Sequence, residues 1–192
     1  MLELDALSCI RIEVLTFPDL KKPAYLKDVN PMGTSPAFTS GVDGLRLFES
    51  GAILCHLLEV YDTKHEMHPA VGSAQRPVYL QNIFYVLTTV YPTVTQLFLH
   101  LLKPVDQQDQ TFLASARTKW KDYIAPTLVL ELGEKLFLLG DNLSAADLLL
   151  GKPLNNANDL GLLDAFPTLK AFFDRVSIRP SFEMAYSADS KF

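Results

Sequence analysis

The chain has 192 residues, of which 48% are hydrophobic and 20% are charged, and its formal net charge is −5. This length allows one large or two small domains, and the balance is typical of a folded globular protein. The acidic charge and the absence of a basic stripe argue against a nucleic-acid partner. Two cysteines, Cys9 and Cys55, are too few for a disulfide framework. With no targeting segment visible in the first residues, we expect the cytoplasm or another reducing compartment.

Two short elements are predicted before residue 30. Ser8–Phe17 alternates apolar residues with Arg11 and Glu13, which predicts a strand. Asp19–Asp28 carries apolar residues at helical spacing and predicts a short helix. In Asn30–Gly33, which follows, proline fixes φ and glycine supplies a positive φ, so a turn is predicted.

A hairpin and a helix are predicted next. Ala37–Thr39 and Leu45–Phe48 are short apolar runs, and Val42–Gly44 between them is a hairpin turn signal. Ser50 is a favourable N-cap residue for a helix that continues to Tyr61. The apolar residues of that helix recur at helical spacing: Ile53, Leu54, Leu57, Leu58 and Tyr61.

The residues around this hairpin suit a zwitterionic peptide ligand. Ser50 and the unpaired N–H groups of the first helical turn form an anion site, and Glu49 beside them can hold an ammonium group. A cis bond between Ser35 and Pro36 would turn the Ser35 backbone N–H and C=O outward, where they could pair with a peptide. The alternative is that Ser50 is only a helix cap and Glu49 only a solvated charge.

The order of Asn30–Gly33, Ser35-Pro36 and Glu49-Ser50 resembles the glutathione-binding half of a cytosolic glutathione transferase. The resemblance implies a thioredoxin-like α/β fold with a cis-proline. It also implies that Ser35, Pro36, Glu49 and Ser50 contact glutathione, either as a substrate or as a ligand.

The start of the chain departs from that family's pattern. A βαβ unit takes roughly 30 or more residues, and a second helix and a turn should also precede Pro36. The 35 residues before Pro36 leave no room for the first strand and most of the first helix, so Met1–Leu7 resembles the tail of that helix. The family's catalytic Tyr, Ser or Cys lies near the missing elements, and no residue maps to it. Ser8 or Cys9 is a candidate substitute, although their position favours a plain strand role.

A linker and a long helix are predicted after residue 62. Asp62–Pro77 is polar with two prolines, and its His65 and His68 are interpreted as solvated loop residues rather than metal ligands. Val78–Leu102 has no charge, but its scattered polar residues argue against an integral membrane protein. We expect it to pack in a bundle and at a homodimer or partner-protein seam. Its predicted apolar stripe is Leu80, Phe84, Leu87, Val94, Phe98 and Leu101.

The remaining sequence predicts helices. Asp109–Gly133 is predicted as a helix bent at Pro126, with Trp120 and Tyr123 in the core or an interface. Ser144–Asp147 is a capping-box signal, which the family carries at the start of a buried helix of its all-helical domain. Phe166–Val176 is predicted as an amphipathic helix after a proline start signal.

These elements give three predicted parts: a truncated thioredoxin-like domain at 1–62, a linker at 63–77 and an all-helical domain at 78–192. The resemblance covers about Ser8–Tyr186. It implies a glutathione-transferase-like protein that is non-catalytic as given and serves as a binding or structural subunit of a larger assembly. The alternative is an active glutathione transferase that conjugates glutathione to electrophilic small molecules.

Overall fold

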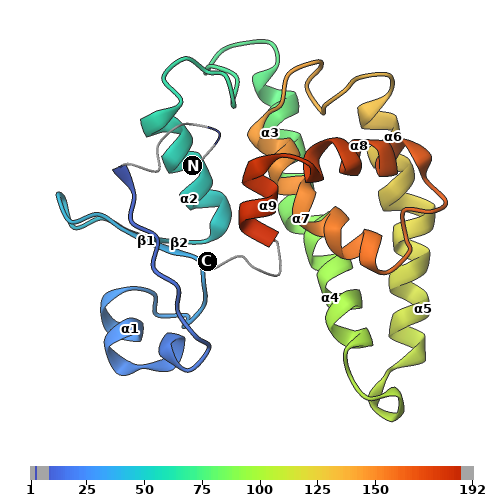
Figure 1. Ribbon diagram of the computed structural model, residues 1–192, viewed down its shortest axis with the longest axis horizontal. Coiled ribbons are helices and arrows are strands. Elements are labelled where there is room, and N and C mark those ends of the chain that lie inside the picture. The colour runs from blue at the N-terminus through green and yellow to red at the C-terminus, as the bar shows by residue number, and fades with distance from the viewer. Residues whose placement is uncertain (1–2, 4–8, 187–192) are drawn as a thin grey trace. The chain divides into compact units, whose positions relative to one another are not determined.

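The computed structural model describes Glu3 and residues 9–186 (Figure 1). The chain divides into two compact units, with the boundary between His65 and Glu66. We call the part up to His65 the N-terminal unit and the part from Glu66 the helical unit. The boundary lies inside the stretch predicted as a linker.

The N-terminal unit contains a small sheet and short helices. A 3₁₀ helix, η3 (Asp19–Lys21), is followed by α1 (Pro23–Asp28), so the helix predicted over this region is confirmed as two pieces. The break between them is at Lys22, which is extended (φ −65°, ψ 140°) because the residue before a proline is driven out of the helical region.

The predicted hairpin is confirmed. Strands β1 (Ala37–Thr39) and β2 (Arg46–Phe48) pair antiparallel, with Phe38 opposite Leu47. Gly44 in the turn has a φ of 72°, which favours glycine. Hydrogen bonds from the Ser40 hydroxyl and the Leu45 N–H hold the pKa of Asp43 below its ordinary value. Helix α2 (Ser50–Tyr61) follows the second strand.

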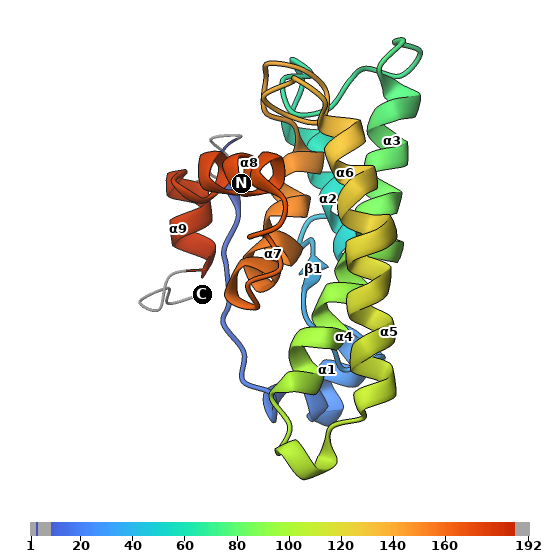
Figure 2. The ribbon, with the colours of Figure 1, turned by 90° about the vertical axis from the view of Figure 1, so that its right-hand side faces the viewer.

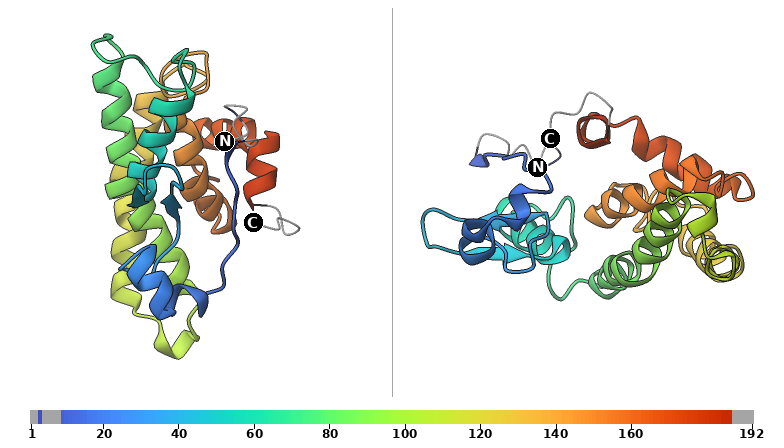
Figure 3. Two further views of the ribbon diagram at one scale, coloured as in Figure 1. Left: turned by 90° about the vertical axis from the view of Figure 1, so that its left-hand side faces the viewer. Right: turned by 90° about the horizontal axis from the view of Figure 1, so that it is seen from below.

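The strand predicted over Ser8–Phe17 is wrong for the residues that the structure describes. Residues 10–16 form no strand, and the segment runs apart from β1 and β2 in the left view of Figure 3. From residue 11 onward its apolar side chains are exposed, with Val14 at 58% and Phe17 at 87%. A strand is completed only by pairing with a neighbour, and the described sheet consists of β1 and β2 alone. Ser8 lies outside the described residues, as does Met1–Leu7 apart from Glu3.

Two long, interrupted helices form one side of the helical unit (Figure 2). We call them the first rod and the second rod. The first rod is α3 (Arg76–Tyr85), η4 (Val86–Val90) and α4 (Tyr91–Leu101), and the second is α5 (Gln110–Lys119), η6 (Trp120–Ile124) and α6 (Ala125–Leu132). A 3₁₀ turn, η5 (Val105–Gln107), lies between them, and the Asp109 carboxylate caps α5 by accepting from the N–H groups of Thr111 and Phe112.

Each rod passes through a proline by means of a π turn. The Tyr91 N–H donates to the Val86 carbonyl in η4, directly before Pro92. The Ala125 N–H donates to the Trp120 carbonyl in η6, directly before Pro126. A proline ring clashes with the carbonyl four residues earlier in a regular α-helix, and a π turn changes that geometry. The helix predicted through Pro126 is therefore confirmed, with a π turn ahead of the proline.

The first rod follows its predicted apolar stripe in part: Val94 is buried, Leu101 packs against the core, and Leu80, Leu87 and Phe98 are half-buried. Its core side consists of Tyr79, Asn82, Ile83, Val86, Val90, Thr93, Val94 and Leu97. Phe84, which belongs to the predicted stripe, is 60% exposed. The pattern was misread because a tyrosine and an asparagine, which a count of apolar residues ignores, take core positions in α3.

Three further helices complete the helical unit: α7 (Ala145–Asp159), α8 (Pro167–Ser177), confirming the helix predicted there, and α9 (Pro180–Tyr186). Helix α7 packs against both α4 and α8. Trp120 is buried as predicted, its indole N–H donates to the Leu162 carbonyl (3.2 Å), and its ring meets Phe166 edge-on. Tyr123 is 68% exposed, so it is not a core residue.

The predicted capping box at the start of α7 is confirmed. The Asp147 carboxylate is fully buried and accepts hydrogen bonds from the Ser144 N–H (2.8 Å), the Ser144 hydroxyl (2.6 Å) and the Leu138 N–H (2.8 Å). Asp147 therefore ties the loop before α7 to the helix itself. Burial raises the pKa of this carboxyl, although the three hydrogen bonds act in the opposite direction.

The interpretation of His68 as a solvated residue is wrong. Its side chain is 5% exposed, and its ring lies 6.5 Å from the Tyr79 ring between centroids. The neighbouring Met67 carbonyl accepts the Ala145 N–H (2.8 Å), which holds this loop against the start of α7. His65 is exposed. No helix among the described residues has a stretch long and apolar enough to cross a membrane.

Candidate functional site

The predicted site residues meet at the open end of the hairpin. Ala37 and Phe48 form the last pair of the ladder, so Pro36 and Glu49 are the next residues outward on the two strands. Proline has no N–H to continue the ladder, which ends here. The register therefore brings Ser35-Pro36 and Glu49-Ser50 to the same edge of the N-terminal unit.

The Ser35–Pro36 peptide bond is cis, as predicted. Ser35 and Pro36 are both exposed. The Ser35 N–H makes no hydrogen bond to any of the described residues. The Ser35 main chain is thus available to an extended peptide laid along this edge.

The predicted N-cap is displaced by one residue. The cap of α2 is Glu49, because its carbonyl accepts the Ile53 N–H (3.0 Å), and Ser50 is the first helical residue. Glu49 makes no side-chain cap, and its φ of 72° lies in the left-handed region that non-glycine residues rarely adopt. Such a conformation costs of order 1–3 kcal/mol and is found most often at functional sites.

The first turn of α2 keeps its donors open. Among the described residues, no hydrogen bond is made by the N–H groups of Ser50, Gly51 or Ala52. These groups and the positive end of the helix dipole favour a bound carboxylate. Glu49 is exposed beside them and can pair with an ammonium group. The edge can therefore hold both charges of an amino-acid zwitterion.

A hydrogen-bond network, which the sequence reasoning missed, holds the loop that leads to Ser35. The Thr34 carbonyl accepts from the Tyr25 hydroxyl (2.7 Å) and from the Asn30 amide (2.9 Å). The Gly33 carbonyl accepts from the Lys21 ammonium (2.9 Å). The Asn30 side chain also accepts the Met32 N–H (3.0 Å) and so closes the turn. The signal for Asn30 was visible as turn chemistry, but nothing in the pattern of Tyr25 or Lys21 pointed to this loop.

Of the two candidate substitutes for the catalytic residue, Cys9 alone falls among the described residues. Cys9 is exposed at the start of the extended segment, and Ser8 lies outside the described residues. The Tyr25 hydroxyl already donates to a main-chain carbonyl.

Comparison with known proteins places the chain in one family. The family model described as the C-terminal domain of glutathione S-transferase matches residues 91–186, half of the 192-residue chain. The chain is 29% identical to glutathione S-transferase Z2 of Arabidopsis thaliana over 165 residues, which cover 83% of this chain and 70% of that protein.

Solved structures extend the likeness to both units. A glutathione transferase homolog from Lodderomyces elongisporus, with two GSH per subunit, has a TM-score of 0.78 at 20% identity. The match covers 90% of this chain and 84% of the homolog's chain. A sphingomonad glutathione S-transferase complexed with glutathione has a TM-score of 0.71 at 26% identity, and the match covers 89% of this chain and 82% of that enzyme's chain. The predicted fold, a thioredoxin-like α/β part followed by an all-helical part, is thereby shown. The chain belongs to the glutathione transferase superfamily.

Proposed function

We propose that this protein binds glutathione at the open end of the hairpin. In the proposed complex the Ser35 main chain, beside Pro36, pairs with the cysteinyl residue of glutathione. Ser50 and the open N–H groups of α2 hold the γ-glutamyl carboxylate, and Glu49 holds its ammonium group. The observation that carries the proposal is the register that sets the cis Ser35–Pro36 bond beside Glu49, whose φ is 72°.

The Ser50 hydroxyl is expected to contribute strongly to glutathione affinity. In the proposed complex it donates a charge-assisted hydrogen bond to a carboxylate, which contributes about 1.5–3 kcal/mol. Ser50→Ala should therefore weaken glutathione binding roughly ten- to a hundred-fold in a calorimetric titration. Ser40→Ala is the matched control, because Ser40 lies at the turn end of the same hairpin. Equal glutathione affinity in wild type and Ser50→Ala would rule out the proposed site.

We further propose that the chain is a binding or structural subunit rather than a catalyst. A glutathione thiol with a pKa near 8.5 is mostly protonated at pH 7, so an enzyme must stabilise the thiolate. At the hairpin edge Ser35 offers main-chain groups, and the Tyr25 hydroxyl is already engaged. A candidate partner surface is the exposed apolar side of the first rod, where Phe84, Leu99 and Leu102 are more than half exposed. A second copy of the chain or another protein could cover it.

The alternative is an active glutathione transferase, which the names of the curated relatives favour. The two roles are separated by the rate at which the protein conjugates glutathione to an aryl halide, measured against pH. We expect a rate close to the uncatalysed one, with a pH profile that follows the thiol pKa of glutathione in solution.

A substantial rate with a thiol pKa well below that of glutathione in solution would establish the catalytic role instead. The same assay on Cys9→Ala identifies the residue responsible. If that variant abolished the rate, Cys9 would be the thiolate-stabilising group.

A further inference from the structure

We propose that Tyr25 is a positioning residue for the bound tripeptide. Its hydroxyl orients the Thr34–Ser35 peptide group so that the Ser35 N–H faces the ligand. The inference rests on the proposed glutathione site and concerns a residue that does not itself touch the ligand.

The contact that carries the inference joins α1 to the loop. Tyr25 is 9% exposed, and its hydroxyl donates to the Thr34 carbonyl at 2.7 Å. The Asn30 amide donates to the same carbonyl at 2.9 Å and to the Thr34 hydroxyl at 3.1 Å. Both lone pairs of the Thr34 carbonyl are therefore engaged from the side of α1 and the Asn30 turn.

The planar peptide group transmits this orientation to Ser35. Among the described residues the cis peptide bond is the one between Ser35 and Pro36, and the Thr34–Ser35 bond before it is trans. In a trans peptide the C=O and the following N–H point in opposite directions within one plane. With the Thr34 carbonyl drawn toward Tyr25, the Ser35 N–H must point away from α1. Ser35 is exposed, and its N–H has no acceptor among the described residues, so it is presented to the outside.

Tyr25 can be tested more cleanly than Asn30. The Asn30 side chain also accepts the Met32 N–H at 3.0 Å and is fully buried, so replacing it would disturb the turn. The Tyr25 hydroxyl makes one hydrogen bond among the described residues. Tyr25→Phe removes that bond and keeps the ring in place.

The test compares two probes on the full chain. Glutathione is titrated by calorimetry. The fragment γ-glutamylmethylamide, which carries the zwitterion but no cysteinyl or glycyl residue, is titrated by NMR on isotope-labelled protein. Tyr25→Phe is expected to weaken glutathione binding about three- to ten-fold, the loss of roughly one hydrogen bond, and to leave the fragment affinity within two-fold. The Ser35 amide signal should shift on glutathione binding in wild type and less in the variant.

A destabilised control variant separates the loss of ligand positioning from a general loss of stability in the N-terminal unit. Leu58→Val truncates a buried side chain in α2, in the same unit but away from the loop, and should lower the unfolding midpoint without changing either affinity. Unchanged glutathione affinity in Tyr25→Phe would overturn the positioning role and leave the binding site standing. An equal loss for both probes would overturn it too, since the damage would then be general. If wild type bound neither probe, the proposed site and the positioning role would both be wrong.

Discussion

Asp147→Ala is expected to lower the free energy of unfolding by about 3–5 kcal/mol. The substitution removes the acceptor of three hydrogen bonds and leaves the Leu138 and Ser144 N–H groups without it. Leu138 is 0% and Ser144 is 3% exposed, so water reaches these donors poorly. Each unsatisfied buried donor costs about 1–3 kcal/mol, and the loop before α7 is released from the helix.

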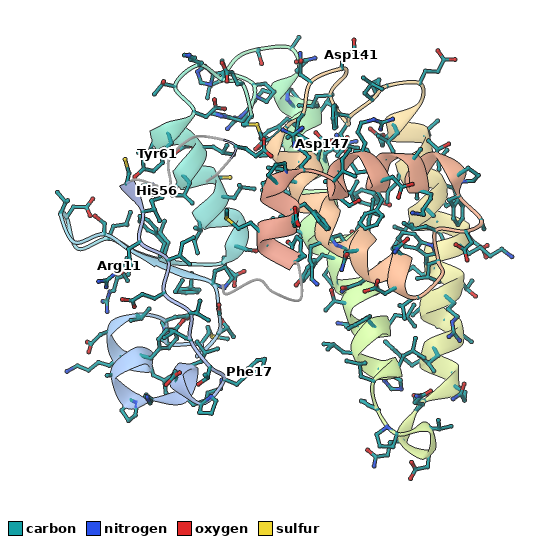
Figure 4. All side chains as sticks on the ribbon, in the orientation of Figure 1. Arg11, Phe17, His56, Tyr61, Asp141 and Asp147 are labelled. Atoms are coloured by element: carbon teal, nitrogen blue, oxygen red, sulfur yellow. The ribbon has the colours of Figure 1, made fainter. Side chains whose placement is uncertain are left out.

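Fluorescence of Trp120, the single tryptophan, follows this unfolding in urea, because the indole is buried in the same unit. Asp141→Ala is the matched control: this aspartate is exposed on the loop before α7, whereas Asp147 lies at the start of the helix (Figure 4). The control should change stability by less than about 0.5 kcal/mol. Equal stability of the two variants would show that the buried carboxylate has no structural role.

The variant Asp147→Asn tests the direction in which the pKa of Asp147 is shifted. Since burial raises the folded pKa of Asp147 above the ordinary value of about 4, the folded protein binds this proton at a higher pH than the unfolded chain. The stability that this group contributes is fully present below about pH 4 and is lost as the pH rises through the folded pKa. The stability difference between wild type and Asp147→Asn should therefore narrow from pH 4 toward pH 7. A difference that widened over this range would contradict the raised pKa.

Gly33→Ala is expected to be nearly as damaging, lowering the free energy of unfolding of the N-terminal unit by about 2–4 kcal/mol. Gly33 has a φ of 62°, where a side chain is strained. An added Cβ would also lie 2.9 Å from the Leu26 side chain, 2.9 Å from the Lys21 ammonium and 3.0 Å from the Leu20 carbonyl. The carbonyl belongs to η3 and cannot swing aside as a flexible side chain can, so the loop before Ser35 must move.

Two other glycines separate the two causes. Gly44 has a φ of 72° but no atom within 4 Å of an added Cβ, so Gly44→Ala should show the conformational cost alone, about 1 kcal/mol. Gly41 has neither feature, and Gly41→Ala should be close to neutral. Stability is measured by circular dichroism during urea unfolding. If Gly33→Ala lowered the free energy of unfolding by no more than Gly44→Ala does, the close contacts at Gly33 would be relieved by small movements and would add no destabilisation.

Local chemistry explains which elements were predictable. The hairpin was found because Val42–Gly44 is a turn signal between two apolar runs, and the structure pairs those runs in register. The capping box was found because Ser144 and Asp147 have the spacing that the contact requires. The cis bond at Ser35–Pro36 was expected from the resemblance of the surrounding segment. In each case the decisive partners lie within a few residues of one another.

The errors have long-range or conformational causes. The strand predicted at Ser8–Phe17 depends on a partner, and alternation within one segment carries no information about its neighbour. The N-cap was set at Ser50 because serine is a good cap, whereas Glu49, with its left-handed φ, is the cap and α2 starts one residue earlier than a serine cap would place it. Tyr25 was missed because its hydrogen bond crosses from α1 to a loop nine residues later. None of these contacts is implied by the composition of a single element.

The two π turns also keep the buried side chains of each rod on one side of it. Buried residues of the second rod recur at intervals of four: Ala116, Trp120, Ile124, Leu128 and Leu132. On a regular α-helix each such step drifts by about 40°, so Ala116 and Leu132 would face roughly opposite sides. A π turn takes up one extra residue and removes about 100° of that drift, which keeps the five side chains on one side of the rod. Val86, Val90 and Val94 have the same spacing in the first rod. A run of four-residue intervals that straddles a proline is therefore a readable sign that a helix continues through it.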